Sequence, residues 1–231
     1  MQTKQIYYEE PYKKEIDCKI VSVETIANLV NVIVDQTIFY PEGGGQPSDR
    51  GTLGEAKVEY VRMINGEIVH QVKGQLTAGK TVKQVLDWDR RYKYMRIHTA
   101  GHVLHDVLLT MFAALSPIGA SHGKKPYIEY EGIINLEKKA EIEQRVNEVV
   151  QQNLAVVTKF ATYEEIEKKC QFIPPNLPKN KPLRMIKIGN FPGMPDGGVQ
   201  VVKTAEIGKI WIAAITINND KSIIRYGIAD L

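Results

Sequence analysis

The stretch YKYMRIHTAGHVLHDVLLTMFAAL, residues 92–115, separates two regions of the chain that have different hydrophobic periods. Within it, apolar side chains recur three or four residues apart, which is the spacing of one face of an α-helix. They are Ile97, Leu104, Val107, Leu108, Met111 and Leu115. The Ser-Pro-Ile-Gly sequence at 116–119 contains residues that end helices. One long helix is therefore predicted for residues 92–115.

The residues before this helix have the features of short β-strands. Runs rich in β-branched residues at 17–35, 56–63, 67–72 and 80–86 alternate with turn-forming residues, among them three consecutive glycines at 43–45. Strands at this spacing are typical of a small barrel or sandwich. We expect an N-terminal β-barrel domain over residues 1–90.

The residues after the helix predict an α+β domain over residues 91–231, with helices packed on an antiparallel sheet. One helix is expected at 137–154, with Ile142, Val146, Val149 and Val150 facing inward, and a short one at 162–170 after the capping box Thr162-Tyr-Glu-Glu165. Strands are expected at 127–130, 183–188, 209–217 and 222–226. Four prolines within residues 171–182 predict a loop.

Composition and charge narrow the possible functions. The 231 residues are 43% hydrophobic and 25% charged, which excludes a disordered chain, a collagen-like fibre and a coiled coil. Two cysteines, Cys18 and Cys170, favour a reducing compartment, and the longest apolar run, residues 211–217, is too short to span a membrane. We expect a soluble, cytoplasmic protein. The net charge is −2 over residues 1–90 and +5 over residues 91–231, so the second region is the better candidate for contact with a phosphate backbone.

Three of the five histidines lie on one face of the predicted helix. A pair at i and i+4, His98 and His102, or at i and i+3, His102 and His105, can direct two ring nitrogens to one zinc ion. Ordinary polar residues on a half-exposed face would have the same spacing. His70, in a predicted strand, and His122, in a predicted loop, have no partner motif and are expected to be ordinary residues.

Two glycine-containing motifs are more specific than ordinary turns. Residues 35–51 have the sequence DQTIFYPEGGGQPSDRG, and residues 195–208 have the sequence PDGGVQVVKTAEIG. With HTAGH at 98–102 between them, the chain resembles the editing domain of alanyl-tRNA synthetase and its free-standing relatives, the AlaX proteins, over about residues 17–217. The length and the complete first motif resemble the longer AlaX subtype, which has a small barrel ahead of the editing fold.

The resemblance implies a hydrolase that acts in trans on mischarged alanine tRNA and removes serine, with glycine as a second candidate. It also implies a zinc ion, held in that family by the two histidines of HxxxH and by a CxxxH in the second glycine motif. This favours His98 and His102 as ligands and places His105 at the pocket wall. Here Asp196 stands at the cysteine position and Gln200 at the histidine position. A carboxylate is an acceptable zinc ligand and an amide is a poor one.

We therefore expect His98, His102 and Asp196 to bind zinc, and Gln200 to hydrogen-bond water or substrate as a catalytic residue. The alternative is that Asp196 only caps the turn, that the site holds no metal, and that the protein is a tRNA-binding module of the same fold. A zinc peptidase is disfavoured because HTAGH lacks the glutamate of HExxH.

Selectivity and tRNA binding need further residues. A pocket that prefers serine to alanine must hydrogen-bond the serine hydroxyl, and Thr37 and Gln46 of the first glycine motif are candidates, although both would also suit turn stabilisation. Cations for the tRNA phosphates are expected in two segments, at Lys124 and Lys125 and at Lys179, Lys181, Arg184 and Lys187.

Overall fold

The computed structural model describes residues 2–26, 29–175 and 177–229, and it divides the chain into two compact units, residues 1–94 and 95–231. The fold is mixed, with antiparallel sheets and helices, as the sequence predicted. Both cysteines are free. Over the described residues, no helix is long and apolar enough to cross a membrane.

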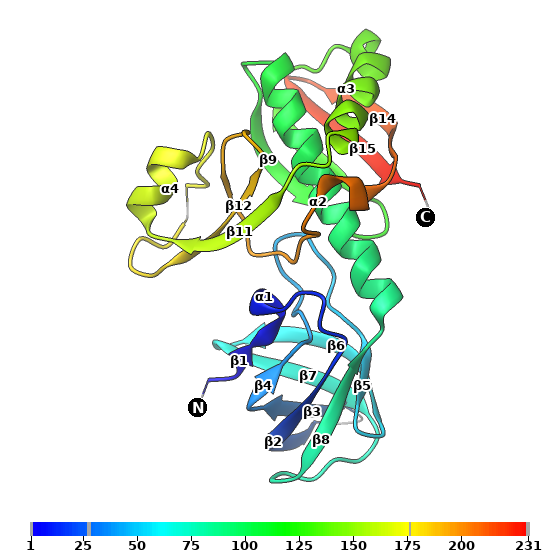
Figure 1. Ribbon diagram of the computed structural model, residues 1–231, viewed down its shortest axis with the longest axis vertical. Helices are drawn as coiled ribbons and strands as arrows, with labels where there is room; N and C mark the ends of the chain where they lie inside the picture. The colour runs from blue at the N-terminus through cyan, green and yellow to red at the C-terminus, as the bar shows by residue number, and fades with distance from the viewer. Residues whose placement is uncertain (1, 27–28, 176, 230–231) are drawn as a thin grey trace. The chain divides into compact units, whose positions relative to one another are not determined.

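The first unit consists mainly of six strands that pair in a closed circle, β2-β3-β7-β6-β5-β8 (Figure 1). Their bounds are β2 Glu15–Ile26, β3 Leu29–Val34, β5 Gly51–Leu53, β6 Ala56–Ile64, β7 Glu67–Lys73 and β8 Thr81–Leu86. Side chains that point inward from these strands, such as Val32, Leu53 and Val58, are fully buried and form the core. The short elements β1 (Lys4–Gln5), α1 (Ile6–Glu9) and β4 (Gln36–Thr37) complete this unit, and β1 pairs with β4.

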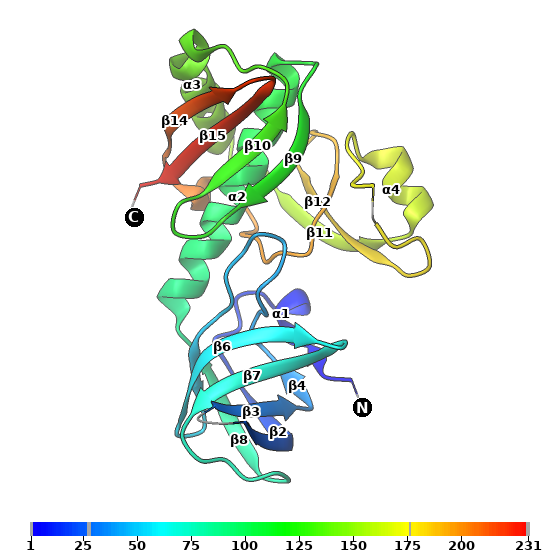
Figure 2. The same ribbon diagram turned by 180° about the vertical axis from the view of Figure 1, so that it is seen from behind.

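The second unit contains a four-stranded sheet in the order β14-β15-β10-β9 (Figure 2). The strands are β9 Ser116–Ser121, β10 Tyr127–Glu131, β14 Ile210–Asn218 and β15 Lys221–Ile228. Two helices cover one face of the sheet, α2 (Trp88–Met111) and α3 (Lys139–Gln151), the latter preceded by the 3₁₀ turn η1 (Leu136–Lys138). The inward residues predicted for the second helix are all buried.

A three-stranded sheet, β11-β12-β13, lies beside this layer. It consists of β11 Val156–Ala161, β12 Leu183–Ile188 and β13 Met194–Pro195. The short helix α4 (Tyr163–Lys169) begins at the predicted capping box of Thr162 and Glu165. The described part of residues 171–182 is the predicted loop, with residue 176 outside the described range. The 3₁₀ turn η2 (Thr204–Ile207) follows the second glycine motif.

Three elements differ from the sequence-based prediction. Helix α2 begins at Trp88 and ends at Met111, four residues earlier at each end than expected. Residues 116–119, predicted to end the helix, belong to strand β9, which pairs with β10 around a bulge that tolerates Pro117 and Gly119. Strand β11 was not predicted, since its exposed Val157 and Phe160 interrupt the alternation that marks a half-buried strand.

Candidate metal site and adjoining cavity

Helix α2 presents two histidines one turn apart to the same point. The rings of His98 and His102 are nearly parallel, with planes 14° apart and centroids separated by 5.0 Å. Both side chains are buried. Ala100, Val103 and Leu104 on the opposite side of α2 are buried in the core and stabilise the helix. The histidine side therefore faces the adjoining cavity, which His102 and His105 line.

Asp196 joins these histidines from the loop that follows β13. Its Oδ1 lies 3.2 Å from Nε2 of His98 and 3.7 Å from Nε2 of His102. The three ligand atoms lie within 4.8 Å of one another. The structure thus brings together the three residues that the sequence analysis named as metal ligands.

Backbone and side-chain hydrogen bonds hold the Asp196 carboxylate in this orientation. Its Oδ2 accepts from the backbone N–H of Gly198 at 2.9 Å and from Nε2 of Gln200 at 2.8 Å, which leaves Oδ1 directed at the histidines. Arg184 on β12 fastens the same loop, because its backbone carbonyl accepts from Asp196 N and its guanidinium donates to the Gly198 carbonyl.

Gln200 is a positioning residue in this structure. Its Nε2 donates to Asp196, and its Oε1 accepts from Thr99 Oγ1 at 2.7 Å. Each end of the amide therefore makes a hydrogen bond within the protein, and the contact of Gln200 with water or substrate stays a prediction. Outer-shell amides of this kind orient a ligand and fix the direction of its lone pairs.

The protonation states suit a cation. Burial lowers the pKa of His98, and the neighbouring Asp196 carboxylate offsets this only in part, so the imidazole is neutral and keeps a lone pair for a ligand bond. For Asp196, burial by itself would raise the pKa, but the two neighbouring histidines more than compensate and hold it well below its ordinary value. A carboxylate and neutral imidazoles are the forms that bind metals.

One buried atom of the cluster lacks a hydrogen bond. Nε2 of His102 is inaccessible to solvent and makes no hydrogen bond with any described residue, because Asp196 Oδ1 lies 3.7 Å away. Such an atom costs roughly 1–3 kcal/mol, which a bound ion would recover. Because two imidazoles and one carboxylate are a common ligand set of catalytic zinc, the residues present fit this metal.

A cavity of about 400 Å³ adjoins the cluster. It is lined by three histidines, His102, His105 and His122, and by apolar side chains such as Phe172, Pro175 and Met194. A volume of this size is in the range of small-molecule sites. The position of His105 agrees with the pocket wall that the resemblance implied.

Comparison with known proteins assigns the chain to a family. Residues 2–90 match the model for class II tRNA synthetases (A). Alanyl-tRNA editing protein AlaX-M from Methanosarcina barkeri is 32% identical over 239 residues, which cover 95% of this chain and 96% of the relative. The chain belongs to the AlaX family of alanyl-tRNA editing proteins.

Longer proteins contain the same AlaX region. AlaX-L from Pyrococcus horikoshii is 38% identical over 218 residues, which are 89% of this chain and 52% of the relative. An alanine–tRNA ligase from Pyrobaculum aerophilum is 34% identical over 236 residues, which are 92% of this chain and 25% of the ligase. The chain therefore spans about half of this AlaX-L and a quarter of the ligase, but nearly all of the AlaX-M relative.

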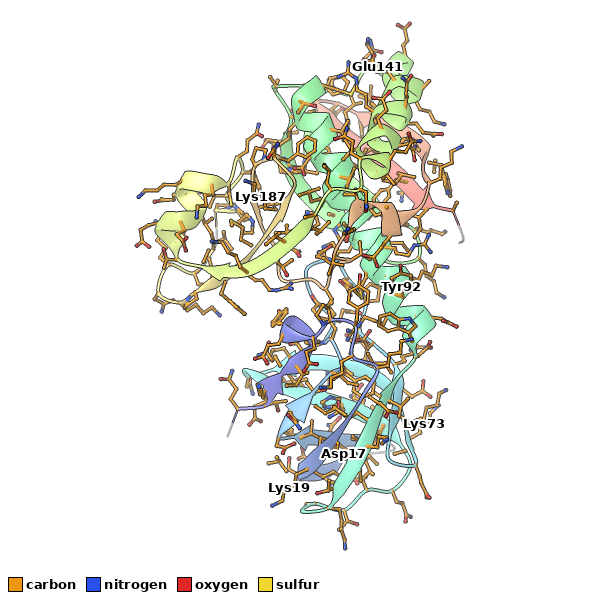
Figure 3. All side chains as sticks on the ribbon, viewed as in Figure 1. Asp17, Lys19, Lys73, Tyr92, Glu141 and Lys187 are labelled. Atoms are coloured by element: carbon orange, nitrogen blue, oxygen red, sulfur yellow. The ribbon has the colours of Figure 1, made fainter. Side chains whose placement is uncertain are left out.

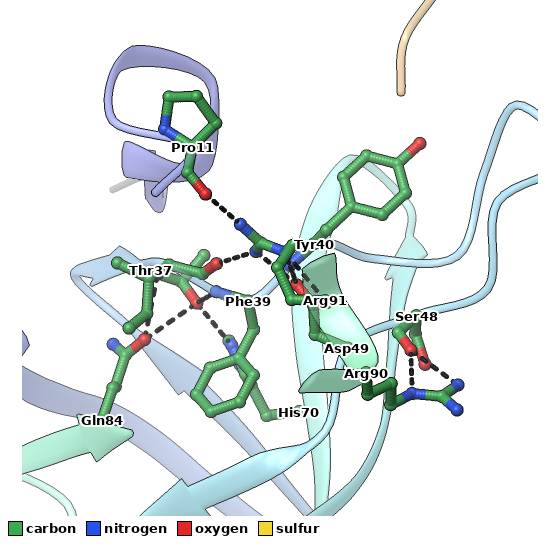
Figure 4. A network of polar contacts seen from close by, with 11 residues as sticks. Pro11, Thr37, Phe39, Tyr40, Ser48, Asp49, His70, Gln84, Arg90 and Arg91 are labelled. Carbon is green, nitrogen blue, oxygen red and sulfur yellow. Dashed lines mark hydrogen bonds and ion pairs between the residues drawn. The ribbon is translucent and has the colours of Figure 1, made fainter. Parts of the chain in front are cut away.

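In this AlaX chain, Thr37 has a structural role. It is fully buried among residues 1–94, and its hydroxyl contacts His70 Nε2 at 2.8 Å and accepts from the backbone N–H of Phe39 (Figure 4). The carbonyl of Val32 faces Nδ1 of His70, so the ring proton is on Nδ1, and the Thr37 hydroxyl lies between two acceptors, Nε2 of His70 and Oε1 of Gln84 at 3.1 Å. The prediction that Thr37 contacts substrate is corrected, because these internal bonds use its hydroxyl.

Gln46, the second selectivity candidate, is buried in the turn of the first glycine motif. Its backbone closes that turn with two hydrogen bonds to Gly43. Nearby, the guanidinium of Arg91 clasps the carboxylate of Asp49, with Nε 2.9 Å from Oδ2 (Figure 4). A role of Gln46 in the substrate pocket stays a prediction.

The lysines expected to meet tRNA are exposed. Lys124 and Lys125 lie between β9 and β10, Lys179 and Lys181 lie in the loop before β12, and the side chain of Lys187 projects from β12 (Figure 3). Arg184 differs from them, because it is buried and donates to Gly198 and Thr158. Its assignment as a tRNA-binding residue is corrected to support of the Asp196 loop.

His122, which the sequence indicated to be an ordinary loop residue, lies against the proposed metal ligands. Its ring stacks on that of His98 with centroids 4.0 Å apart, although 24 residues separate the two positions in sequence. Burial is the largest cause that moves its pKa well below 6.5, followed by the nearby His98 and His102. A strand predicted at residues 116–121 would have indicated this position. His122 directly follows that strand, β9, and lies against α2.

Proposed function

We propose that this protein is an aminoacyl-tRNA deacylase. Its main substrate is alanine tRNA mischarged with serine, and its second substrate is alanine tRNA mischarged with glycine. The observation that carries the proposal is the cluster of His98, His102 and Asp196 beside a cavity in a chain of the AlaX family. The relatives are named for alanyl-tRNA editing. Because the substrate is a tRNA, we place the reaction in the cytoplasm.

His98, His102 and Asp196 would hold zinc in this proposal. The ion would supply Lewis acidity toward the ester carbonyl or toward a water molecule. The chain itself does the positioning: Gln200 and Gly198 fix the carboxylate, and α2 fixes the two imidazoles. An aminoacyl ester is already reactive, so placing it next to a prepared site accounts for much of the rate.

The cavity would hold the aminoacyl end of the tRNA. Its apolar side chains, among them Phe172, Pro175 and Met194, suit the flat faces of a sugar and base, and the proposed metal ligand His102 also lines it. The exposed lysines on residues 95–231 would bind phosphates of the tRNA body.

Metal content and hydrolysis test the proposal together. Protein purified without chelator should contain about one zinc per chain and should release serine from seryl-tRNA(Ala) faster than alanine from alanyl-tRNA(Ala). Asp196→Asn keeps the shape of the side chain but loses its charge, and it should reduce both zinc content and hydrolysis. Asp220→Asn, in an exposed turn of the same unit, is the matched control and should change neither.

The competing function is a tRNA-binding module without catalysis. It would be supported if the wild-type protein binds alanine tRNA but hydrolyses none of the three aminoacyl forms. Retention of both zinc and activity in Asp196→Asn would refute the proposed ligand set.

Electrostatic binding of tRNA is tested separately. If the lysines bind phosphates, the affinity for tRNA should fall as salt rises, and Lys179→Ala with Lys181→Ala should make the logarithmic salt slope shallower by about 1–2. Replacing Lys139, which is exposed on α3, is the matched control. A salt-independent affinity would count against this surface.

A further inference from the structure

His122 lies at the point where the cavity meets the proposed metal ligands, and the function proposed above gives it no role. It follows β9 directly, is buried, and lines the cavity together with His102 and His105. Its ring also stacks on His98. A side chain in this place would touch a molecule bound in the cavity.

Hydrogen bonding fixes the tautomer of His122. Its Nδ1 lies 2.7 Å from the hydroxyl of Tyr226, and this hydroxyl donates its single proton to the backbone carbonyl of Ile97 at 3.1 Å. The hydroxyl can therefore only accept from His122, so Nδ1 carries the ring proton. In a neutral ring, Nε2 then has a free lone pair and acts as an acceptor.

The position of the ring is fixed as firmly as its tautomer. A Cβ at position 101 would lie 2.7 Å from Cε1 of His122 and 2.5 Å from the Tyr226 hydroxyl, so the glycine of HTAGH makes room for both groups. The described residues give His122 one hydrogen bond, through Nδ1. Nε2 is therefore the ring nitrogen that remains for a bound molecule.

We propose that Nε2 of His122 accepts a hydrogen bond from the side-chain hydroxyl of a seryl group in this cavity and thereby separates serine from alanine. The inference rests on the proposed deacylase function and adds its specificity-determining residue. None of the described residues that line the cavity is acidic, so the acceptor matches a neutral hydroxyl better than a cation. An alanyl group would leave this acceptor without the hydroxyl as its partner in the occupied cavity, which costs binding.

Binding of stable substrate analogues tests this assignment without hydrolysis. The probes are 3′-(L-seryl)amino-3′-deoxyadenosine and its L-alanyl counterpart, in which an amide replaces the ester, measured by calorimetry on the whole protein. The wild-type protein should prefer the seryl compound by about 10- to 100-fold. His122→Asn retains only the position of Nδ1 and should reduce the preference to near unity, whereas His122→Gln can place an acceptor near the position of Nε2 and should retain most of it.

His105→Asn is the matched control, because His105 lines the same cavity but has its Nδ1 2.9 Å from the Tyr130 hydroxyl. It should keep the preference for the seryl compound. If His122→Asn does not fold, Tyr226→Phe replaces it: this variant keeps the ring of His122 but releases its tautomer, so the preference should fall while circular dichroism stays unchanged.

The outcomes separate the two proposals. A wild-type preference that survives in His122→Asn, or an equal loss in the Asn and Gln variants, would overturn the role of His122 and leave the deacylase proposal intact. Failure of the wild-type protein to bind either compound, together with no hydrolysis of seryl-tRNA(Ala), would overturn both.

Discussion

Acidification should loosen the N-terminal unit through His70. Burial lowers the pKa of this imidazole from 6.5 to about 4. The unfolded chain takes up a proton near pH 6.5, whereas the folded chain stays neutral at this ring until about pH 4, so stability is lost as pH falls between these values. At about 1.36 kcal/mol per unit, the full loss is about 3 kcal/mol, of which about 2 kcal/mol is reached near pH 5.

Hydrogen exchange of the backbone amides of β3 and β7 measures this loss where His70 lies. After correction for the intrinsic rate, protection should fall by about 30-fold between about pH 7.5 and about pH 5, which corresponds to about 2 kcal/mol. His70→Gln has no titrating ring, so its protection should vary much less over the same interval. The reasoning fails if both proteins lose protection equally, or if NMR shows the His70 ring of the folded protein titrating above about pH 6.

Three further substitutions test the packing and the site. Gly101→Ala places a Cβ against His122, so the free energy of unfolding measured in urea should fall by about 1–3 kcal/mol. In a helix with open space at this position the same change usually increases stability, so a gain would contradict the packing. Arg91→Lys removes the planar guanidinium that binds the Asp49 carboxylate, and the free energy of unfolding in urea should fall by about 3 kcal/mol. An unchanged unfolding midpoint would contradict this role of Arg91. Gln200→Ala frees the proposed metal ligand and should weaken zinc binding by about 10-fold in competition with a chelator, whereas equal affinity would leave the amide no positioning role.

Local sequence signals predicted the elements whose causes are local. The histidine spacing of α2 and the capping box at Thr162 depend on neighbours within four residues, and both are present in the structure. The position of Asp196 beside the histidines could be predicted only through the family resemblance, because 94 residues separate it from His102.

Contacts between distant segments explain what the sequence did not predict. His122 follows a strand that exists only because it pairs with β10, so its stacking on His98 has no local signal. Arg184 and Thr37 carry polar groups that, in sequence, suit a surface or a pocket. In the fold, the Arg184 guanidinium donates to the backbone carbonyl of Gly198, and the Thr37 hydroxyl contacts the buried imidazole of His70.

The clasp between Arg91 and Asp49 has a consequence for dividing the chain into fragments. Arg91 lies on α2, one residue past the end of the predicted barrel domain, yet its guanidinium also donates to the carbonyl of Pro11. A fragment ending at residue 90 would leave the Asp49 carboxylate buried without its counter-charge. A separately expressed barrel would therefore have to include the first two turns of α2, up to residue 94, where the first unit ends.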